Sequence, residues 1–249
     1  MSYGRFAYLY DQLMEDAPYD EWVSFVERAW ELYGRNKEKS LLDLGCGTGE
    51  LSIRLAKNGF NVTGVDLSAD MLSVAKAKSE EAGMSLPFYE QDMAELEMPG
   101  EYGVIGIFCD SLNYLRTVED VKSTFVHSAK HLGSGGLLLF DVHSIYKVAN
   151  GFINQSFSLN GDSVSYIWDS FDGDQPHSVE HEISFFVLDD SDGRYDRFDE
   201  LHYQRTYPIE EYSKLLEESG FEIASITADF SNTAPSPESE RIFFIARKR

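Results

Sequence analysis

Apolar positions change along the chain from helical spacing to short continuous runs, and this alternation predicts the fold class. Helical spacing predicts two N-terminal helices, around Phe6–Leu13 and Trp22–Ala29, joined at 17–19, with Asp20 as the cap of the second. Short apolar runs then predict strands at 40–44, 61–66, 86–90, 103–109 and 136–142, with helices at about 49–58, 69–82 and 119–132. Because strands and helices alternate, we expect a doubly wound α/β core with a parallel sheet and helices on both faces.

The pattern changes between residues 151 and 207, where polar and apolar residues alternate with a period of two. Turn signals at Asp172-Gly173 and Asp192-Gly193 divide this segment into three expected antiparallel strands, at about 163–171, 178–188 and 196–207. We therefore expect a core formed by residues 1–150 and 208–249. Residues 151–207 form a small antiparallel β insert, which serves as a substrate lid or a dimer contact.

The core pattern resumes at Pro208, which begins a helix that Gly220 ends. Strands at 221–229 and 241–247 follow, with a Pro/Ser loop and no helix between them. Because parallel neighbours need a long crossover connection, these two strands must pair antiparallel or lie apart.

Composition narrows the classes of partner. The 249 residues suffice for one domain with an insertion, and the net charge of −22 argues against a nucleic-acid substrate, since phosphate binding rests on Lys and Arg. No apolar run reaches the ~18 residues of a membrane span, and the N-terminus lacks the layout of a signal peptide, so we expect a cytoplasmic protein without membrane contact. The two cysteines, Cys46 and Cys109, are expected to be small buried thiols.

The strongest local signal is the glycine turn Asp43-x-Gly45-x-Gly47-x-Gly49, which joins the first core strand to a helix. A dinucleotide turn reads G-x-G-x-x-G, but Glu50 stands where its third glycine would be, and no phosphate loop with G-K-[ST] occurs. The turn contains no Lys or Arg, so it suits a zwitterion better than a pyrophosphate. The helix N-terminus can favour a carboxylate, and Asp43 can face an ammonium or a sulfonium.

Together with Asp66 at the end of the second strand, this turn resembles the first motifs of class I S-adenosylmethionine-dependent methyltransferases, in particular the small-molecule N-methyltransferase-like group. The resemblance extends over about residues 20–145 and 208–249, and it implies a mostly parallel seven-stranded sheet with an antiparallel last strand. It implies that the three glycines let the backbone approach S-adenosylmethionine, that Asp66 binds the ribose hydroxyls and that Asp92 binds the adenine amino group. Met71 either packs on the adenine or belongs to the core. The cofactor-binding residues expected from the resemblance are Asp43, Gly45, Cys46, Gly47, Gly49, Asp66, Leu67, Met71, Asp92, Met93, Cys109 and Asp110.

Methyl transfer is an in-line displacement in which the protein mainly orients the reactants, although an amine must arrive unprotonated and a hydroxyl usually needs a base. Tyr10, Asn113 and His143 are the expected catalytic residues, with Tyr114 as a further candidate. Asn113 and His143 follow the fourth and fifth strands, whose carboxyl ends face the ligand in open parallel sheets. Tyr10 lies in a segment that resembles the helix covering the cofactor in small-molecule N-methyltransferases.

We expect a methyl acceptor that is a small molecule with an amine or a hydroxyl group. Nucleic-acid amine methyltransferases often carry a Pro-Pro-aromatic segment after the fourth strand. In this chain residues 110–114 take that place and read Asp-Ser-Leu-Asn-Tyr, and the missing prolines argue against methylation of a base amine. Methylation of a modified tRNA base, a non-catalytic cofactor-binding module and a nicotinamide oxidoreductase remain alternatives. In the insert, His181, His202 and Arg205 could contact substrate, but the alternation leaves open which face points inward. No metal site is expected, and the protein is a monomer or a homodimer.

Overall fold

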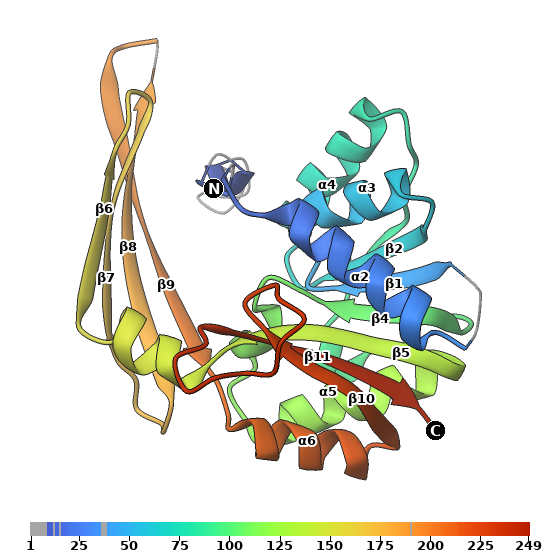
Figure 1. The fold of residues 1–249 in the computed structure, drawn as a ribbon. Helices are drawn as coiled ribbons and strands as arrows, with labels where there is room; N and C mark the ends of the chain where they lie inside the picture. Colours follow the sequence, from blue (N-terminus) through green and yellow to red (C-terminus); the bar gives the residue numbers. More distant parts are fainter. Residues whose placement is uncertain (1–8, 12, 15, 36–38, 190) are drawn as a thin grey trace.

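Two β-sheets organise the chain, and the seven-stranded one forms the core (Figure 1). The computed structural model describes residues 9–11, 13–14, 16–35, 39–189 and 191–249. The core sheet has the strand order β10-β11-β5-β4-β1-β2-β3. Its strands are β1 (Ser40–Leu44), β2 (Asn61–Asp66), β3 (Phe88–Glu90), β4 (Tyr102–Ile107), β5 (Leu132–His143), β10 (Phe221–Ala228) and β11 (Arg241–Lys248).

Strands β1 to β5 are mutually parallel, and β11 runs antiparallel to both of its neighbours, β5 and β10. The doubly wound sheet with an antiparallel last strand is thereby confirmed. Of the two arrangements open to the last strands, pairing is the one adopted, from Phe221 opposite Lys248 to Ala228 opposite Ile242. The register between β11 and β5 places Arg241 opposite His143, at the edge where the parallel strands end.

Helices pack on both faces of this sheet, because each presents one apolar stripe. On one face, α5 (Val118–His131) and α6 (Ile209–Glu218) bury Phe125 and Tyr212 in one hydrophobic cluster. On the other, α2 (Tyr19–Tyr33) and α3 (Glu50–Lys57) bury residues such as Phe25 in a second cluster. Helix α4 (Ala69–Glu81) follows β2. In the parts of the chain that the structure describes, no helix is long and apolar enough to cross a membrane.

The helix ends largely follow the expected caps. Ser68 caps α4 by accepting a hydrogen bond from the Met71 amide at 3.3 Å. Asp20 is not the cap of α2, however, because it lies inside this helix, which begins at Tyr19. The residue at the cap position is Pro18, and no side chain caps the helix there. Residues 9–11 and 13 are helical as expected, whereas Phe6 lies outside the described residues.

The insert forms a separate antiparallel sheet of four strands that stands beside the core (Figure 1). Its strands are β6 (Gln155–Asn160), β7 (Val164–Asp172), β8 (Ser178–Asp189) and β9 (Arg194–Arg205). The expectation of three strands was wrong, because it missed β6. This strand lies at the sheet edge with mostly exposed side chains, so its sequence carries little hydrophobic signal and its pairing with β7 decides its conformation.

Candidate active site

The glycine turn lies between β1 and α3, and its three glycines all adopt positive φ angles, +72° at Gly45, +53° at Gly47 and +75° at Gly49. A Cβ at Gly45 would lie 2.7 Å from the Cβ of Ser111, and one at Gly49 would lie 2.9 Å from the Cβ of Ala75. A Cβ at Gly47 would meet nothing within 4 Å. Gly45 and Gly49 therefore permit close packing of the protein itself, and a Cβ at Gly47 would face open space. That all three glycines also let the backbone approach the cofactor stays a prediction.

Two acids at the strand ends, the half-buried Asp66 and the buried Asp43, lie at this turn. The Asp66 carboxylate accepts the Gly47 amide at 2.8 Å and the Ser68 amide at 2.9 Å, which joins the turn to the end of β2. Asp43 is 2% exposed and accepts a hydrogen bond from the Ser52 hydroxyl at 2.5 Å. Burial raises the pKa of Asp66 and raises that of Asp43 to about 7, because water does not solvate these charges freely.

The remaining expected cofactor residues follow strands β2 and β3. These two strands pair with each other, and Asp66 of β2 lies opposite Glu90 of β3. Leu67 is 69% exposed beside this edge, and Met71 is half-buried in the first turn of α4. The exposed Asp92 accepts the Ala94 amide at 2.8 Å, and the half-buried Met93 packs against the core cluster.

A cavity of about 40 Å³ lies at the glycine turn, and we call it the turn cavity. None of its lining residues, all within the described ranges, is Lys or Arg. Open space above Gly47, a buried carboxylate and no cation fit a sulfonium zwitterion and do not fit a pyrophosphate. The lining includes Tyr10, Asp43, Cys46, Gly47, Cys109 and Ser111.

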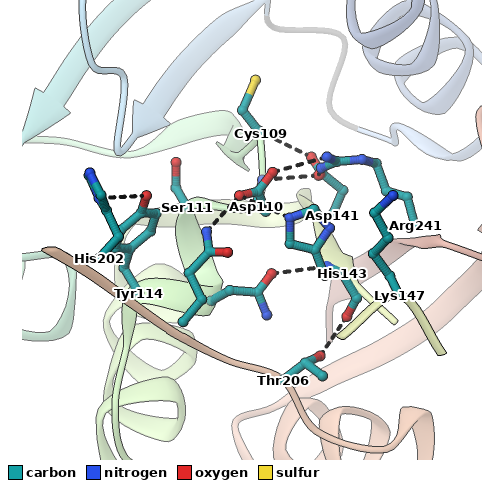
Figure 2. A network of polar contacts seen from close by, with 12 residues as sticks. Cys109, Asp110, Ser111, Tyr114, Asp141, His143, Lys147, His202, Thr206 and Arg241 are labelled. Atoms are coloured by element: carbon teal, nitrogen blue, oxygen red, sulfur yellow. Dashed lines mark hydrogen bonds and ion pairs between the residues drawn. The ribbon is translucent and has the colours of Figure 1, made fainter. Parts of the chain in front are cut away.

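Beyond β4, Cys109 and Asp110 form a turn with left-handed φ angles of +53° and +52°. Both amides donate hydrogen bonds to the fully buried Asp141 carboxylate, at 3.0 Å from Cys109 and 3.1 Å from Asp110 (Figure 2). Asp141 also accepts from the indole N–H of Trp22 at 2.8 Å and from the guanidinium of Arg241. Non-glycine residues rarely adopt this conformation, so the buried carboxylate stabilises a strained turn.

The strained turn aims the Asp110 side chain at three partners (Figure 2). One carboxylate oxygen accepts from Arg241 at 3.0 Å. The other accepts from Gln204 at 2.8 Å and lies 3.3 Å from Nε2 of His143. Burial opposes ionisation, but His143 and Arg241 outweigh it and hold the pKa of Asp110 well below its usual range. Asp110 is therefore a carboxylate at neutral pH.

A second cavity, of about 360 Å³, lies between the core and the four-stranded sheet, and we call it the insert cavity. Tyr10, Cys109 and Ser111 line both cavities, so the two adjoin. The sheet contributes its inward face, which carries His202 and Gln204 rather than Tyr203 and Arg205. The lining includes Asp110 and His143 from the core and Trp168, His181, His202 and Gln204 from the sheet.

The expected catalytic residues differ in their placement. Tyr10 lines both cavities, and the neighbouring Asp11 ties this segment to the core by accepting from Thr48 at 2.5 Å and from Lys78 at 2.9 Å. His143 lines the insert cavity at the end of β5. Asn113 lines neither of the two cavities, which corrects its expected placement.

The side chain of Asn113 is instead used inside the protein. It is 1% exposed, accepts the His143 amide at 2.9 Å and donates to the Arg205 carbonyl at 2.8 Å. It therefore joins the end of β5 to the end of β9. Tyr114, by contrast, lines the insert cavity, and its hydroxyl lies 3.2 Å from Nδ1 of His202.

Sequence reasoning missed Trp168, Gln204, Asp141 and Arg241. Only Asp141 carried a usable signal, since it is an acid inside the apolar run 137–142 at the end of a predicted strand. The other three come from the insert and the last strand, where nothing local distinguishes them from ordinary strand residues.

Known proteins resemble this chain over its whole length. A family model described as a methyltransferase domain matches residues 41–136. The chain is 52% identical over 248 residues to a protein of Geobacillus sp. (strain WCH70) and 48% identical over 249 residues to one of Bacillus subtilis (strain 168), each named "Putative methyltransferase". These alignments span 100% of this chain and 100% and 98% of those proteins. A crystal structure of an S-adenosylmethionine-dependent methyltransferase from Clostridium acetobutylicum ATCC 824 superimposes with a TM-score of 0.88, at 32% identity, over 100% of this chain and 99% of that one.

The fold, the glycine turn and these relatives together define a cofactor-dependent transferase. The chain belongs to the class I S-adenosylmethionine-dependent methyltransferases, and S-adenosylmethionine is its cofactor. The nicotinamide oxidoreductase and the non-catalytic module are thereby set aside.

Proposed function

We propose that the enzyme methylates an amine or a hydroxyl group of a small molecule bound in the insert cavity, with the four-stranded sheet as its lid. The insert cavity carries this proposal. Its volume of about 360 Å³ is within the range of sites for small molecules, and it adjoins the turn cavity through shared lining residues. A lid that excludes water would also shape the pocket around the acceptor.

Residues of the chain then divide between the two reactants. We assign the ribose hydroxyls to Asp66, the adenine edge to Asp92 with Met93, and the methionine part to Asp43, Gly47 and the Cys109 turn. S-adenosylmethionine, when bound, supplies the methyl group on a positively charged sulfur. The protein's contribution is to orient the acceptor in line with that group and to take up a proton, for which His143 is the candidate in the insert cavity.

The charge distribution favours a small molecule over tRNA. The insert sequence carries 12 acidic residues against 3 basic ones, within a chain of net charge −22. An RNA backbone would approach this sheet against its electrostatic field, since phosphate binding depends on neutralisation by Lys and Arg.

The cofactor half is tested by calorimetry with S-adenosylhomocysteine. Asp66→Ala should weaken binding at least about tenfold, because it removes charge-assisted hydrogen bonds worth roughly 1.5–3 kcal/mol each. Asp70→Ala, an exposed acid one turn further on, should leave binding unchanged. Equal binding by both variants would contradict the assignment of Asp66.

The acceptor half is tested with a radiolabelled methyl donor. Label should enter a small-metabolite pool and not total tRNA. Incorporation into tRNA alone would overturn the small-molecule proposal and leave the cofactor assignment intact.

A further inference from the structure

The insert cavity carries carboxylate charge but little free positive charge. Among the described residues that line it, Arg241 is the only Lys or Arg. Its guanidinium is already shared between Asp110 and Asp141, and before any charge on His143 is counted this is one positive charge against two carboxylates. The cavity therefore offers an anion no free cation and offers a cation the Asp110 carboxylate.

Aromatic rings form much of the wall of the insert cavity. Phe152 lies 6.0 Å from Trp168 and 5.1 Å from the His181 ring, and Tyr166 lies 6.1 Å from Phe185, between ring centroids. All five residues line the cavity. The faces of such rings attract cations, most strongly where water is excluded.

Two of the proton acceptors in the cavity, Asp110 and His181, are weak. Asp110, with its lowered pKa, is a stable counter-ion but a poor base. Burial lowers the pKa of His181 to about 4, and its Nδ1 already faces the Trp168 indole N–H at 3.0 Å and the Ser170 hydroxyl at 2.8 Å. A hydroxyl acceptor needs a strong base near its oxygen, whereas an ammonium needs only to lose one proton before it reacts.

We propose that the acceptor is a small amine, cationic at neutral pH and carrying an apolar or aromatic body, whose ammonium group pairs with Asp110. This inference rests on the proposed function and chooses between its two acceptor groups. In its neutral form, the His143 imidazole takes one proton from the ammonium. The nitrogen lone pair then forms the new N–C bond as the S–C bond of the cofactor breaks and its electron pair stays on sulfur. A methylammonium product leaves, and the proton on His143 returns to solvent.

The inference is tested by binding rather than by turnover. Wild-type protein saturated with S-adenosylhomocysteine is titrated with three probes that share a phenylethyl body: phenethylamine, 2-phenylethanol and 3-phenylpropionate. Ligand-observed NMR should show the amine binding at least about tenfold more tightly than the alcohol, a difference of about 1.4 kcal/mol, with the carboxylate weakest. Because this comparison uses the unaltered protein, it does not depend on a variant that folds.

Two variants then locate the effect. Asp110→Asn should abolish the preference for the amine over the alcohol, while Asp172→Asn, an exposed acid on β7, should preserve it. Far-UV circular dichroism and cooperative urea unfolding show that each variant is folded. Equal or tighter binding of the alcohol, or no amine binding by the cofactor-saturated wild type, overturns the inference and leaves the proposed function standing. A failure of S-adenosylhomocysteine to bind to the wild-type protein would instead count against the proposed function.

Discussion

Replacing Asp141 with Asn should destabilise the protein substantially, although the two side chains have nearly the same shape. Every group around the carboxylate is a donor: the Trp22 indole and the Cys109 amide on one oxygen, the Asp110 amide and Arg241 on the other. An amide has one acceptor oxygen and one NH₂ group. Whichever way it is turned, its NH₂ group faces two donors and leaves both without a partner.

The magnitude follows from these contacts. Each buried donor that loses its partner costs roughly 1–3 kcal/mol, and Arg241 keeps only one of its two carboxylates. Burial raises the pKa of Asp141, which shows that the charge itself is costly to desolvate, and a neutral amide avoids part of that cost. We therefore expect Asp141→Asn to lower the free energy of unfolding by about 2–4 kcal/mol.

The assay is urea unfolding at pH 7, followed by tryptophan fluorescence and by far-UV circular dichroism. Asp162→Asn, an exposed acid of the insert, is the matched control and should change the free energy by less than about 0.5 kcal/mol. If Asp141→Asn behaves like this control, the carboxylate does not stabilise the turn at Cys109 and Asp110, and the reasoning is refuted.

Two further predictions concern titration and the glycine turn. The neutral form of His181 is favoured in the fold, so the unfolded chain binds more protons between pH 4 and 6.5, and stability falls with decreasing pH in this window, by up to about 3 kcal/mol. His181→Asn, which keeps an acceptor but does not titrate, should flatten this dependence as measured by urea unfolding. Gly45→Ala should lower the free energy of unfolding by about 2–4 kcal/mol through left-handed strain and the clash with Ser111. Gly47→Ala should cost only about 1 kcal/mol of stability but weaken S-adenosylhomocysteine binding, as calorimetry would show.

Each of these has its own check. His177→Asn replaces an exposed histidine with a residue that tolerates its φ of +60°, so it should leave the pH dependence as in the wild type. A His181→Asn protein with the wild-type slope would contradict the prediction. For the turn, the reverse order of stabilities at Gly45 and Gly47 would show that the open space above Gly47 has been misassigned.

The core of the fold was predictable because its signals are local. Each parallel strand is a short apolar run and each helix shows its own spacing, so the alternation from 40 to 142 sufficed for the parallel part of the sheet. The edge strand β6 escaped prediction for the opposite reason. Its side chains are mostly exposed, and only its hydrogen bonds to β7 make it a strand.

Asn113 shows a different limit of sequence reasoning. Its position after the fourth strand predicts a side chain at the carboxyl ends of the parallel strands, but position along a chain does not tell which way a side chain points. The amide turns inward, where two backbone groups of β5 and β9 need partners, and such groups are rarely left unpaired when buried.

The sequence by itself determined the cofactor. The glycine turn and Asp66 lie within a short stretch of chain, so the spacing of Gly45, Gly47 and Gly49 and the absence of Lys and Arg favour a zwitterion, and the family resemblance of these motifs implies S-adenosylmethionine. Only the tertiary structure decided which residues meet in the insert cavity. Arg241 reaches Asp110 across 131 residues of sequence, because the antiparallel β11 lies beside β5 and delivers the guanidinium to the ends of the parallel strands. The charge and burial of a group depend on neighbours that the fold brings together, and no local pattern records them.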